Sequence, residues 1–410
     1  MSQTTSLGFD PRNPAFVADP YPFFRKLRAA APVWKGLGGR WFVTGYDNTA
    51  LILKDRRFGK DYSDPEALTR RFGPTALQEP AVVELTNMML MRDPPDHTRL
   101  RGLVTQAFTA RRVEAMRERV KALTDALLDK VQAPGRTGGR MDAIRDLAFP
   151  LPVLVICDLL GIPEADQARF VTGSASGGAL LNPTTPTRAE LDNANAGIEE
   201  SGRYFEALFA LRRREPRDDL ITKLVQAEEG GDRLTTAELR ANVNLLFAAG
   251  HETTVNLIGN GLLWLLRHPE QWRMLRDDPR LIPNAIEEVL RYESPVQAVA
   301  RTVAEPLDLG GMKLGRSEIV VMLIGAANRD PAAFENAETF DVTRKDPRPL
   351  SFGGGIHFCL GAQLARIEAA IVFETMLRRL PGLRLLEADN PQWRPSFTLR
   401  GLTSLPVAWD

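Results

Sequence analysis

A cysteine near the C-terminal end of the chain stands in a stretch suited to ligating a metal. Residues 351–361 read SFGGGIHFCLG and hold Cys359, His357 and three successive glycines. Glycines are needed where the backbone turns sharply or closely approaches a bulky, flat group. A cysteine just before a helix feels the positive end of the helix dipole, which favours the thiolate, the form that binds metals. We therefore interpret Cys359 as a thiolate held against a large ligand or metal.

The remaining metal-binding residues are too few and too scattered for a zinc site. Structural zinc needs four ligands, and the chain has one further cysteine, Cys157, and three further histidines. Cys157 lies in the apolar run VLVICDLLGIP, which indicates core packing. A metal with one thiolate ligand and its other positions filled by a macrocycle fits better, and that is haem with a cysteine ligand.

A second candidate site lies in the middle of a long apolar helix, at the sequence AGHETT. Gly250 leaves a gap on the helix surface, at a cost of about 1 kcal/mol relative to alanine. Glu252 beside the Thr253 hydroxyl is the arrangement that a proton relay needs. The alternative is that Glu252 pairs with a basic group and the threonine hydroxyls bond back to the helix. From these residues alone, the two interpretations are equal.

The elements that would position these residues are mostly helical. A capping box of Thr235 and Glu238 opens the longest helix, which runs toward Pro269 and could span about 45 Å. We expect a helix from Asp47, as its N-cap, to about Lys54, and an irregular segment over residues 59–96. The charged run 212–219 is interpreted as a solvated turn. A helix that carries His97 and Arg101 is expected after the run Asp93–Asp96. Further helices are expected at about 113–131, 188–214, 283–294 and 361–380, with short strands at 32–45, 300–345 and 383–410.

Composition excludes several classes of protein. The 410 residues carry 52 basic and 52 acidic side chains, which gives no reason to expect nucleic acid as a partner. The first 16 residues contain no apolar run long enough for a signal peptide or a membrane anchor. Two cysteines make no disulfide framework, so we expect a protein of the reducing cytoplasm without a membrane partner.

Taken in order along the chain, these motifs resemble those of the bacterial, soluble cytochrome P-450 family. FGGGIHFCLG is similar to the haem-ligand signature of that family, which is a highly specific motif. AGHETT resembles its oxygen-activation motif, EVLR its Glu-x-x-Arg motif, and DPPDHTRLR its haem-propionate helix. The resemblance covers essentially the whole chain. It implies a single domain over residues 1–410, mainly α with a minor β region, in which a triangular helical bundle encloses haem b.

The resemblance also implies roles for individual residues. Cys359 would be the proximal ligand of the haem iron, Gly250 would open a kink over the haem, and Glu252 and Thr253 would deliver protons during oxygen activation. Haem contacts would come from Phe352 near the sulfur and from the propionate-binding residues His97, Arg101, Arg301 and His357. A structural charge network would consist of Glu288, Arg291 and Arg344.

The family layout further implies an apolar substrate pocket. Its walls would come from the loop before His97, the long helix, the segment after Pro295 and the C-terminal region. A lid would include residues 171–181. The pocket residues are Met88, Leu90, Leu245, Ala249, Val296, Val299 and Phe397. Because none of these carries a charge, we expect an apolar substrate of moderate size, such as a terpenoid, fatty acyl chain, steroid or polyketide.

The resemblance implies a monooxygenase that hydroxylates or epoxidises this substrate with dioxygen. Electrons would come from a separate ferredoxin or flavodoxin with its NAD(P)H-dependent reductase. Arg99, Arg111, Arg112 and Arg366 are candidate contacts for this partner, although each could equally be solvated surface. Two other hypotheses stay open: a peroxide-driven hydroxylase or decarboxylase, and a haem-binding sensor without turnover. The Glu252–Thr253 pair argues against both.

Overall fold

The computed structural model describes residues 10–60, 64–133, 139–172, 180, 186–229, 234–388 and 390–410. The chain divides into two compact units. Unit 1 consists of Met1–Gly59, Val120–Phe149 and Thr253–Asp410, and unit 2 of Lys60–Arg119 and Pro150–Glu252. Two long helices, α7 (Ala110–Gln132) and α12 (Thr236–Arg267), cross from one unit into the other.

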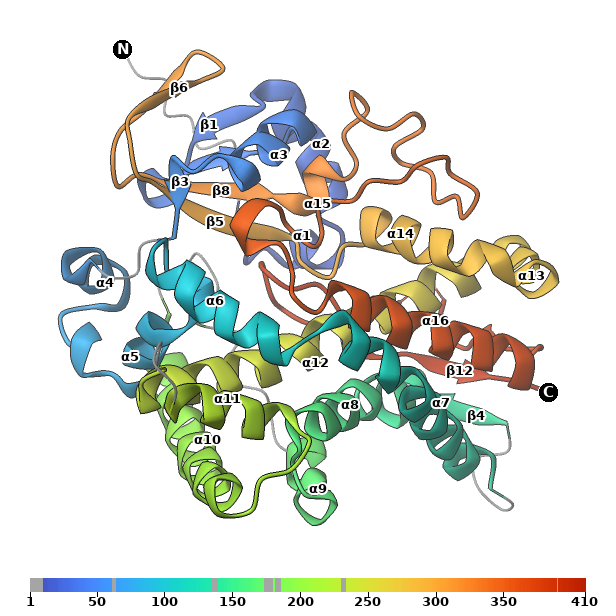
Figure 1. Cartoon of the computed structure of the whole chain (residues 1–410). Coiled ribbons are helices and arrows are strands. Elements are labelled where there is room, and N and C mark those ends of the chain that lie inside the picture. The colour runs from blue at the N-terminus through green and yellow to red at the C-terminus, as the bar shows by residue number, and fades with distance from the viewer. Residues whose placement is uncertain are drawn as a thin grey trace. The chain divides into compact units, whose positions relative to one another are not determined.

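Unit 1 is built on a five-stranded sheet with the order β1-β2-β8-β5-β3. β1 and β2 form the expected antiparallel hairpin, β8 runs parallel to β2, and β5 pairs with β8 in antiparallel register from Ala298–Leu323 to Thr302–Ile319. The helices α2 (Tyr21–Ala30) and α3 (Tyr46–Lys54) both contact α15 (Ile324–Ala327) (Figure 1). The strands of this sheet are β1 (Val33–Lys35), β2 (Trp41–Val43), β3 (Phe58–Gly59), β5 (Ala298–Val303) and β8 (Ile319–Leu323).

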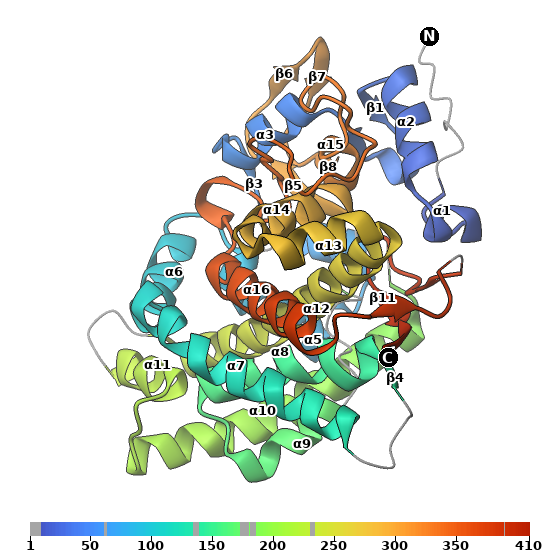
Figure 2. The ribbon, with the colours of Figure 1, turned by 90° about the vertical axis from the view of Figure 1, so that its right-hand side faces the viewer.

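The helices of unit 1 include two that matter most for the site, α14 and α16, which lie side by side (Figure 2). α16 begins three residues after Cys359 and is buried along much of its length. The helices of unit 1 are α1 (Pro14–Ala18), α2 (Tyr21–Ala30), α3 (Tyr46–Lys54), α13 (Pro269–Asp277), α14 (Ile282–Tyr292), α15 (Ile324–Ala327) and α16 (Ala362–Arg379). The smaller sheets use β4 (Arg140–Asp142), β6 (Leu307–Leu309), β7 (Met312–Leu314), β9 (Arg384–Leu385), β10 (Gln392–Trp393), β11 (Leu402–Ser404) and β12 (Pro406–Ala408).

Unit 2 is helical throughout the part that the structure describes. α10 packs against α5 and α11, α11 against α6, and α8 against α9 (Figure 1). The helices are α4 (Pro65–Phe72), α5 (Pro80–Asn87), α6 (Asp96–Ala107), α8 (Pro150–Leu160), α9 (Glu164–Thr172), α10 (Arg188–Arg214) and α11 (Leu220–Glu229). Together with unit 1 they confirm a mainly α protein with a minor β region.

The capping box at the start of α12 forms as the sequence predicts. The Thr235 N–H donates to Glu238 at 2.9 Å, and the Glu238 N–H donates to the Thr235 hydroxyl at 3.1 Å. These two bonds satisfy donors that have no partner within the helix. Most residues of α12 are buried, so burial of its apolar side chains stabilises it far more than helix propensity does.

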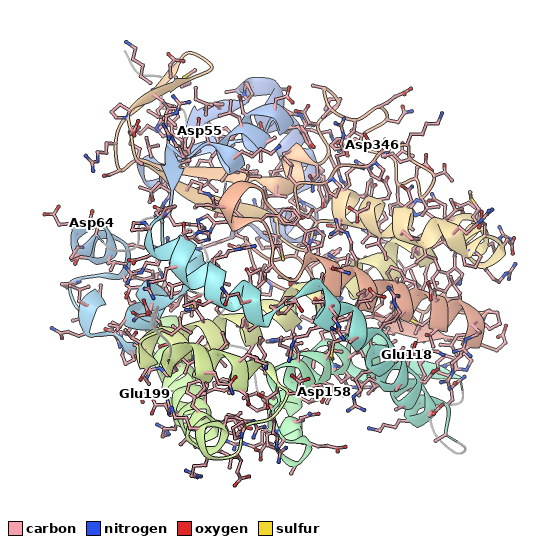
Figure 3. The ribbon with its side chains drawn as sticks, in the orientation of Figure 1. Asp55, Asp64, Glu118, Asp158, Glu199 and Asp346 are labelled. Atoms are coloured by element: carbon pink, nitrogen blue, oxygen red, sulfur yellow. The ribbon has the colours of Figure 1, made fainter. Side chains whose placement is uncertain are left out.

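Three expectations for local structure are wrong. Residues 59–96 contain α4 and α5; Asp64, labelled in Figure 3, caps α4 by accepting the N–H of Glu66 at 2.9 Å. α3 is capped at Gly45, and Asp47 lies in its first turn. The run 212–219 is not a solvated turn, because Arg212 and Asp219 are buried and paired at 2.6 Å. Most of the expected lid, residues 171–181, lies outside the described residues.

Candidate functional site

The loop that carries Cys359 is shaped by its glycines. Gly353 and Gly355 have φ angles of +71° and +63°, which other residues seldom adopt. A Cβ on Gly355 would lie 2.6 Å from the carbonyl oxygen of Leu53 in α3, so the loop also lies directly against that helix. The Cys359 N–H donates to the Phe352 carbonyl at 2.9 Å and closes the loop. The glycine-rich stretch therefore forms a tight loop that holds one half-buried thiol.

The start of this loop is tied to α14 through two side chains that sequence reasoning missed. Ser351 Oγ donates to the Leu290 carbonyl at 2.6 Å, and Asn328 Nδ2 donates to Ser351 Oγ at 2.9 Å. Asn328 Oδ1 accepts the N–H of Leu350 at 2.8 Å. A hydrogen-bonded serine next to a glycine run is too common a pattern to have revealed this support. The effect is to hold the Cys359 loop in one position relative to α14.

The structure brings Glu288, Arg291 and Arg344 together as a buried charge network. Arg291 contacts both carboxylate oxygens of Glu288 at 2.7 Å, and Arg344 Nε lies 3.0 Å from Glu288 Oε2. Arg291 also donates to the carbonyls of Asn328 and Ala337. Buried charges need such full hydrogen bonding to offset desolvation. The network joins α14 to the segment that leads into the Cys359 loop.

Four more of the predicted site residues belong to unit 1: Arg301, Val296, Val299 and Phe397. Arg301 is buried on β5, and its neighbour on the same face, Val299, also packs against the core of the sheet. Phe397 is 8% exposed and contacts Phe16, with ring centroids 6.2 Å apart. Val296 forms an isolated β-bridge with Leu399. Val299 and Phe397 therefore contribute to the packing of the core.

In unit 2, α6 carries His97 and Arg101 one turn apart, and hence on one side of the helix. His97 is 3% exposed and Arg101 is half-buried. The helix start is held by Asp93, whose carboxylate accepts the N–H of Lys60 at 2.9 and 3.0 Å. A buried imidazole beside a guanidinium is a donor set that suits carboxylates.

One face of α12 is open in its otherwise buried middle. Ala249 is exposed, and Gly250, Glu252 and Thr253 are half-buried. A Cβ on Gly250 would lie 3.1 Å from Ile156 Cδ1 in α8, so this glycine permits the close packing of two helices. α12 is α-helical without interruption from Thr236 to Arg267. The acid and the hydroxyl therefore follow one another on a continuous helix.

The methionine-rich segment is anchored to α12. Asn242 Oδ1 accepts the N–H of Met89 at 2.9 Å, and Asn242 Nδ2 donates to the Asn87 carbonyl at 3.1 Å. Met88 is 8% exposed and Leu90 is half-buried. Leu245, also buried, lies one turn of α12 beyond Asn242. Among the predicted pocket residues of unit 2, the structure thus gathers Met88, Leu90, Leu245 and Ala249 on α12 or beside it.

The donor set fits a haem group that is bound through one protein sulfur. Within the described ranges, no three His, Cys, Asp or Glu side chains gather in a way that could hold a metal ion. Burial raises the pKa of Cys157 to about 12, which keeps that thiol protonated and unsuited to ligation. Cys359 lies at the start of a long helix, on a loop that allows close approach. A macrocycle that brings its own nitrogen ligands needs no more than this one thiolate.

Comparison with known proteins agrees with this site. Residues 204–391 match the family model for cytochrome P450. The "Biotin biosynthesis cytochrome P450" of Bacillus subtilis is 42% identical, over 96% of this chain and 97% of that protein. The crystal structure of P450BioI in complex with an acyl carrier protein ligated to hexadec-9Z-enoic acid has a TM-score of 0.88 at 41% identity, and covers 97% of this chain and all of that one. The crystal structure of the myxobacterial cytochrome P450 CYP267B1 in complex with myristic acid also has a TM-score of 0.88 at 41% identity, and covers 97% of this chain and 98% of that one. The chain belongs to the cytochrome P450 family, and it is a haem-thiolate monooxygenase that binds protoporphyrin IX haem.

Proposed function

We propose that Cys359 is the thiolate ligand of the haem and that the enzyme hydroxylates or epoxidises an apolar small molecule. The observation that carries this proposal is the Cys359 loop itself. Its positive-φ glycines, its closure by the Cys359–Phe352 hydrogen bond and its anchorage through Ser351 hold one sulfur still at the start of α16. The bound haem supplies oxygen activation and the oxidation of an unactivated C–H bond.

The protein's own residues bind, orient and supply protons. His97, Arg101, Arg301 and His357 would hold the haem propionates, and Phe352 would pack beside the Cys359 sulfur. Glu252 and Thr253 would take up protons from solvent and donate them in the site, because a half-buried acid next to a hydroxyl can both accept and donate a proton. Glu288, Arg291 and Arg344 keep the segment before the loop in place.

A fatty acyl chain is the substrate class that we favour. The proposed pocket residues carry no charge, which suits an aliphatic chain. Two of the similar structures hold acyl groups, one of them on an acyl carrier protein. A spectral titration with myristic acid, its methyl ester and a steroid of similar size tests this choice. We expect the acyl compounds to shift the Soret band at lower concentrations than the steroid; the reverse order would contradict the acyl class.

The electron donor is proposed to be a separate ferredoxin or flavodoxin that docks on the Cys359 side of unit 1. Ile356 and Phe358 on the Cys359 loop are exposed by 51% and 45%, and exposed apolar side chains often mark a binding surface. The candidate arginines are less available than the sequence suggests. Arg99 pairs with Glu238, Arg112 with Asp218 and Arg366 with Glu287.

The experiment that tests the ligand is the absorption spectrum of the reduced protein with carbon monoxide. We expect the red-shifted Soret band of a thiolate-ligated haem, and its loss in Cys359→Ser. Cys157→Ser is the matched control and should keep the band. A spectrum typical of histidine ligation, or a Cys359→Ser variant that keeps the thiolate band, would overturn the proposal. Turnover with peroxide alone at the rate of the full redox chain would favour the peroxide-driven alternative.

A further inference from the structure

Arg366 on α16 is held in place by a glutamate of α14. Its Nε lies 2.5 Å from Glu287 Oε1, and its Nη2 lies 3.1 Å from Glu287 Oε2. Arg366 Nη1 also donates to the Ala362 carbonyl at 3.3 Å, one turn earlier in the same helix. The planar guanidinium therefore has two of its edges occupied, which fixes the orientation of its plane.

The central carbon of this guanidinium lies over the ring of Phe352. The distance from Arg366 Cζ to the Phe352 ring centroid is 4.4 Å, within the range of a cation–π contact. Phe352 stands on the Cys359 loop, and its carbonyl accepts the N–H of Cys359 at 2.9 Å. A continuous series of contacts thus leads from Glu287 through Arg366 and Phe352 to the backbone of Cys359.

This arrangement has little to do with holding the two helices together. The side chains of Arg366 and Glu287 are 38% and 22% exposed, and solvent weakens an ion pair at such exposure. The neighbouring Glu288 already anchors α14 through the fully buried pair with Arg291. The contact with Phe352 instead places a positive charge beside the loop that carries the proposed thiolate.

We propose that Arg366, oriented by Glu287, is a positioning residue that holds the Phe352 ring against the Cys359 loop and raises the reduction potential of the haem. The inference rests on the proposed role of Cys359 as haem ligand. Reduction takes one electron from an iron–sulfur or flavin carrier, converts ferric to ferrous iron and breaks no bond. The site gains one negative charge in this step, so a nearby guanidinium favours the reduced state.

Redox titration of the haem-loaded protein tests the inference. Arg366→Gln removes the positive charge and the cation–π contact together, and we expect its potential to fall by about 59 mV, a tenfold change in the equilibrium constant of a one-electron couple. Glu287→Gln keeps one acceptor oxygen that can orient Arg366 but removes the opposing negative charge, so the potential should rise. Arg366→Lys keeps the charge but loses the planar fork, so its potential should lie between those of Arg366→Gln and the unmodified protein.

A second arginine of α16 provides the matched control. Arg378 forms an exposed ion pair with Asp125 at 3.3 Å, and Arg378→Gln removes the same charge from the same helix without touching Phe352. We expect the potential of this variant to stay unchanged. Equal shifts in Arg366→Gln and Arg378→Gln would show a general charge effect and would overturn the inference.

The carbon monoxide spectrum separates failure of this inference from failure of the proposed ligand. A thiolate band that persists in Arg366→Gln together with an unchanged potential would overturn the role of Arg366 alone. If that variant instead showed slower electron transfer from the carrier at the same potential, Arg366 would be a docking residue. Absence of the thiolate band in the unmodified protein would overturn the assignment of Cys359, and the inference with it.

Discussion

Arg291 and Glu288, one helical turn apart on α14, form a bidentate ion pair in which Arg291 Nε and Nη2 each lie 2.7 Å from a Glu288 carboxylate oxygen. Both side chains are fully buried. Arg344 shares the same carboxylate, and the Asp341 N–H donates to it at 2.9 Å. Each carboxylate oxygen of Glu288 therefore accepts two hydrogen bonds. Charges buried in this way stabilise one arrangement of chain segments and tolerate the loss of a partner poorly.

We expect Glu288→Gln to destabilise the fold by about 3–5 kcal/mol, because it leaves the buried Arg291 and the half-buried Arg344 without a countercharge. Urea unfolding followed by circular dichroism measures this loss, and the yield of haem-loaded protein should fall with it. Glu114→Gln is the matched control: Glu114 forms an exposed pair with Arg117 at the same i, i+3 spacing. That change should cost less than about 1 kcal/mol. Equal losses in the two variants would contradict the role of burial.

Thr253→Ala should separate oxygen consumption from product formation. The variant keeps the haem ligand and the apolar residues, so substrate binding measured by the Soret shift should be unchanged. Product per NAD(P)H should fall about tenfold or more, because a positioned proton donor contributes about 10²- to 10⁴-fold. Hydrogen peroxide should appear in its place.

The control for this relay is Thr253→Ser, which keeps a hydroxyl at the same position. We expect it to retain most of the coupling between NAD(P)H oxidation and product. Thr253→Ala with undiminished coupling would show that protons arrive by another route.

Glu368 gives the protein a pH-dependent loss of stability. Its side chain lies within α16 with 1% exposure, and burial raises the pKa of this carboxyl well above 4.5. The folded state therefore keeps a proton that the unfolded state releases as the pH rises above 4.5. Stability falls with increasing pH until the folded-state pKa is passed.

We expect Glu368→Gln to remove this fall. Between pH 5 and pH 8, the free energy of unfolding of the variant should rise relative to that of the unmodified protein. The size of this rise follows from about 1.36 kcal/mol per pKa unit. Urea midpoints at the two pH values measure the difference. Glu374→Gln, an exposed site on the same helix, should leave the pH dependence as it was. A parallel pH dependence in Glu368→Gln would contradict the assignment.

Glu79 links the segment before α5 to the start of α10. Its carboxylate accepts from Arg188 at 2.7 Å and from Asn195 at 2.6 Å, both on α10, and from the Thr75 hydroxyl at 2.7 Å. Hydrogen bonding by Arg188 is the main reason that the pKa of Glu79 is lowered to about 2. The stabilisation is therefore fully present above about pH 4.5 and is lost as the pH falls toward 2.

We expect Glu79→Gln to increase hydrogen exchange at the backbone amides of α5 and of the first turns of α10 at pH 7. Asp192→Asn is the control, because Asp192 contacts the same arginine from an exposed position. Exchange in that variant should resemble the unmodified protein. An increase spread evenly over unit 2 in Glu79→Gln would indicate general destabilisation instead of a local link.

Much of the site can be predicted from short stretches of sequence, because its main features are local. The spacing of glycines, histidine and cysteine in residues 351–361 indicates a haem-thiolate loop, and the structure shows a loop whose glycines adopt positive φ. The capping box of α12 and the limits of α14 and α16 also follow from residues a few positions apart. Periodicity and capping act over one or two turns, so a single sequence is enough to read them.

The tertiary structure decided what distant residues do to one another. The charged run that contains Arg212 and Asp219 looks solvated in sequence, but the two ends meet in a buried ion pair. In the sequence, Gly250 indicates room for a ligand; in the structure it also allows Ile156 of another helix to pack closely. From the sequence, Arg366 could be a solvated surface residue. The structure shows that it contacts Glu287, 79 residues earlier, and the Phe352 ring. Burial and charge pairing depend on which segments the fold brings together, and no local pattern carries that information.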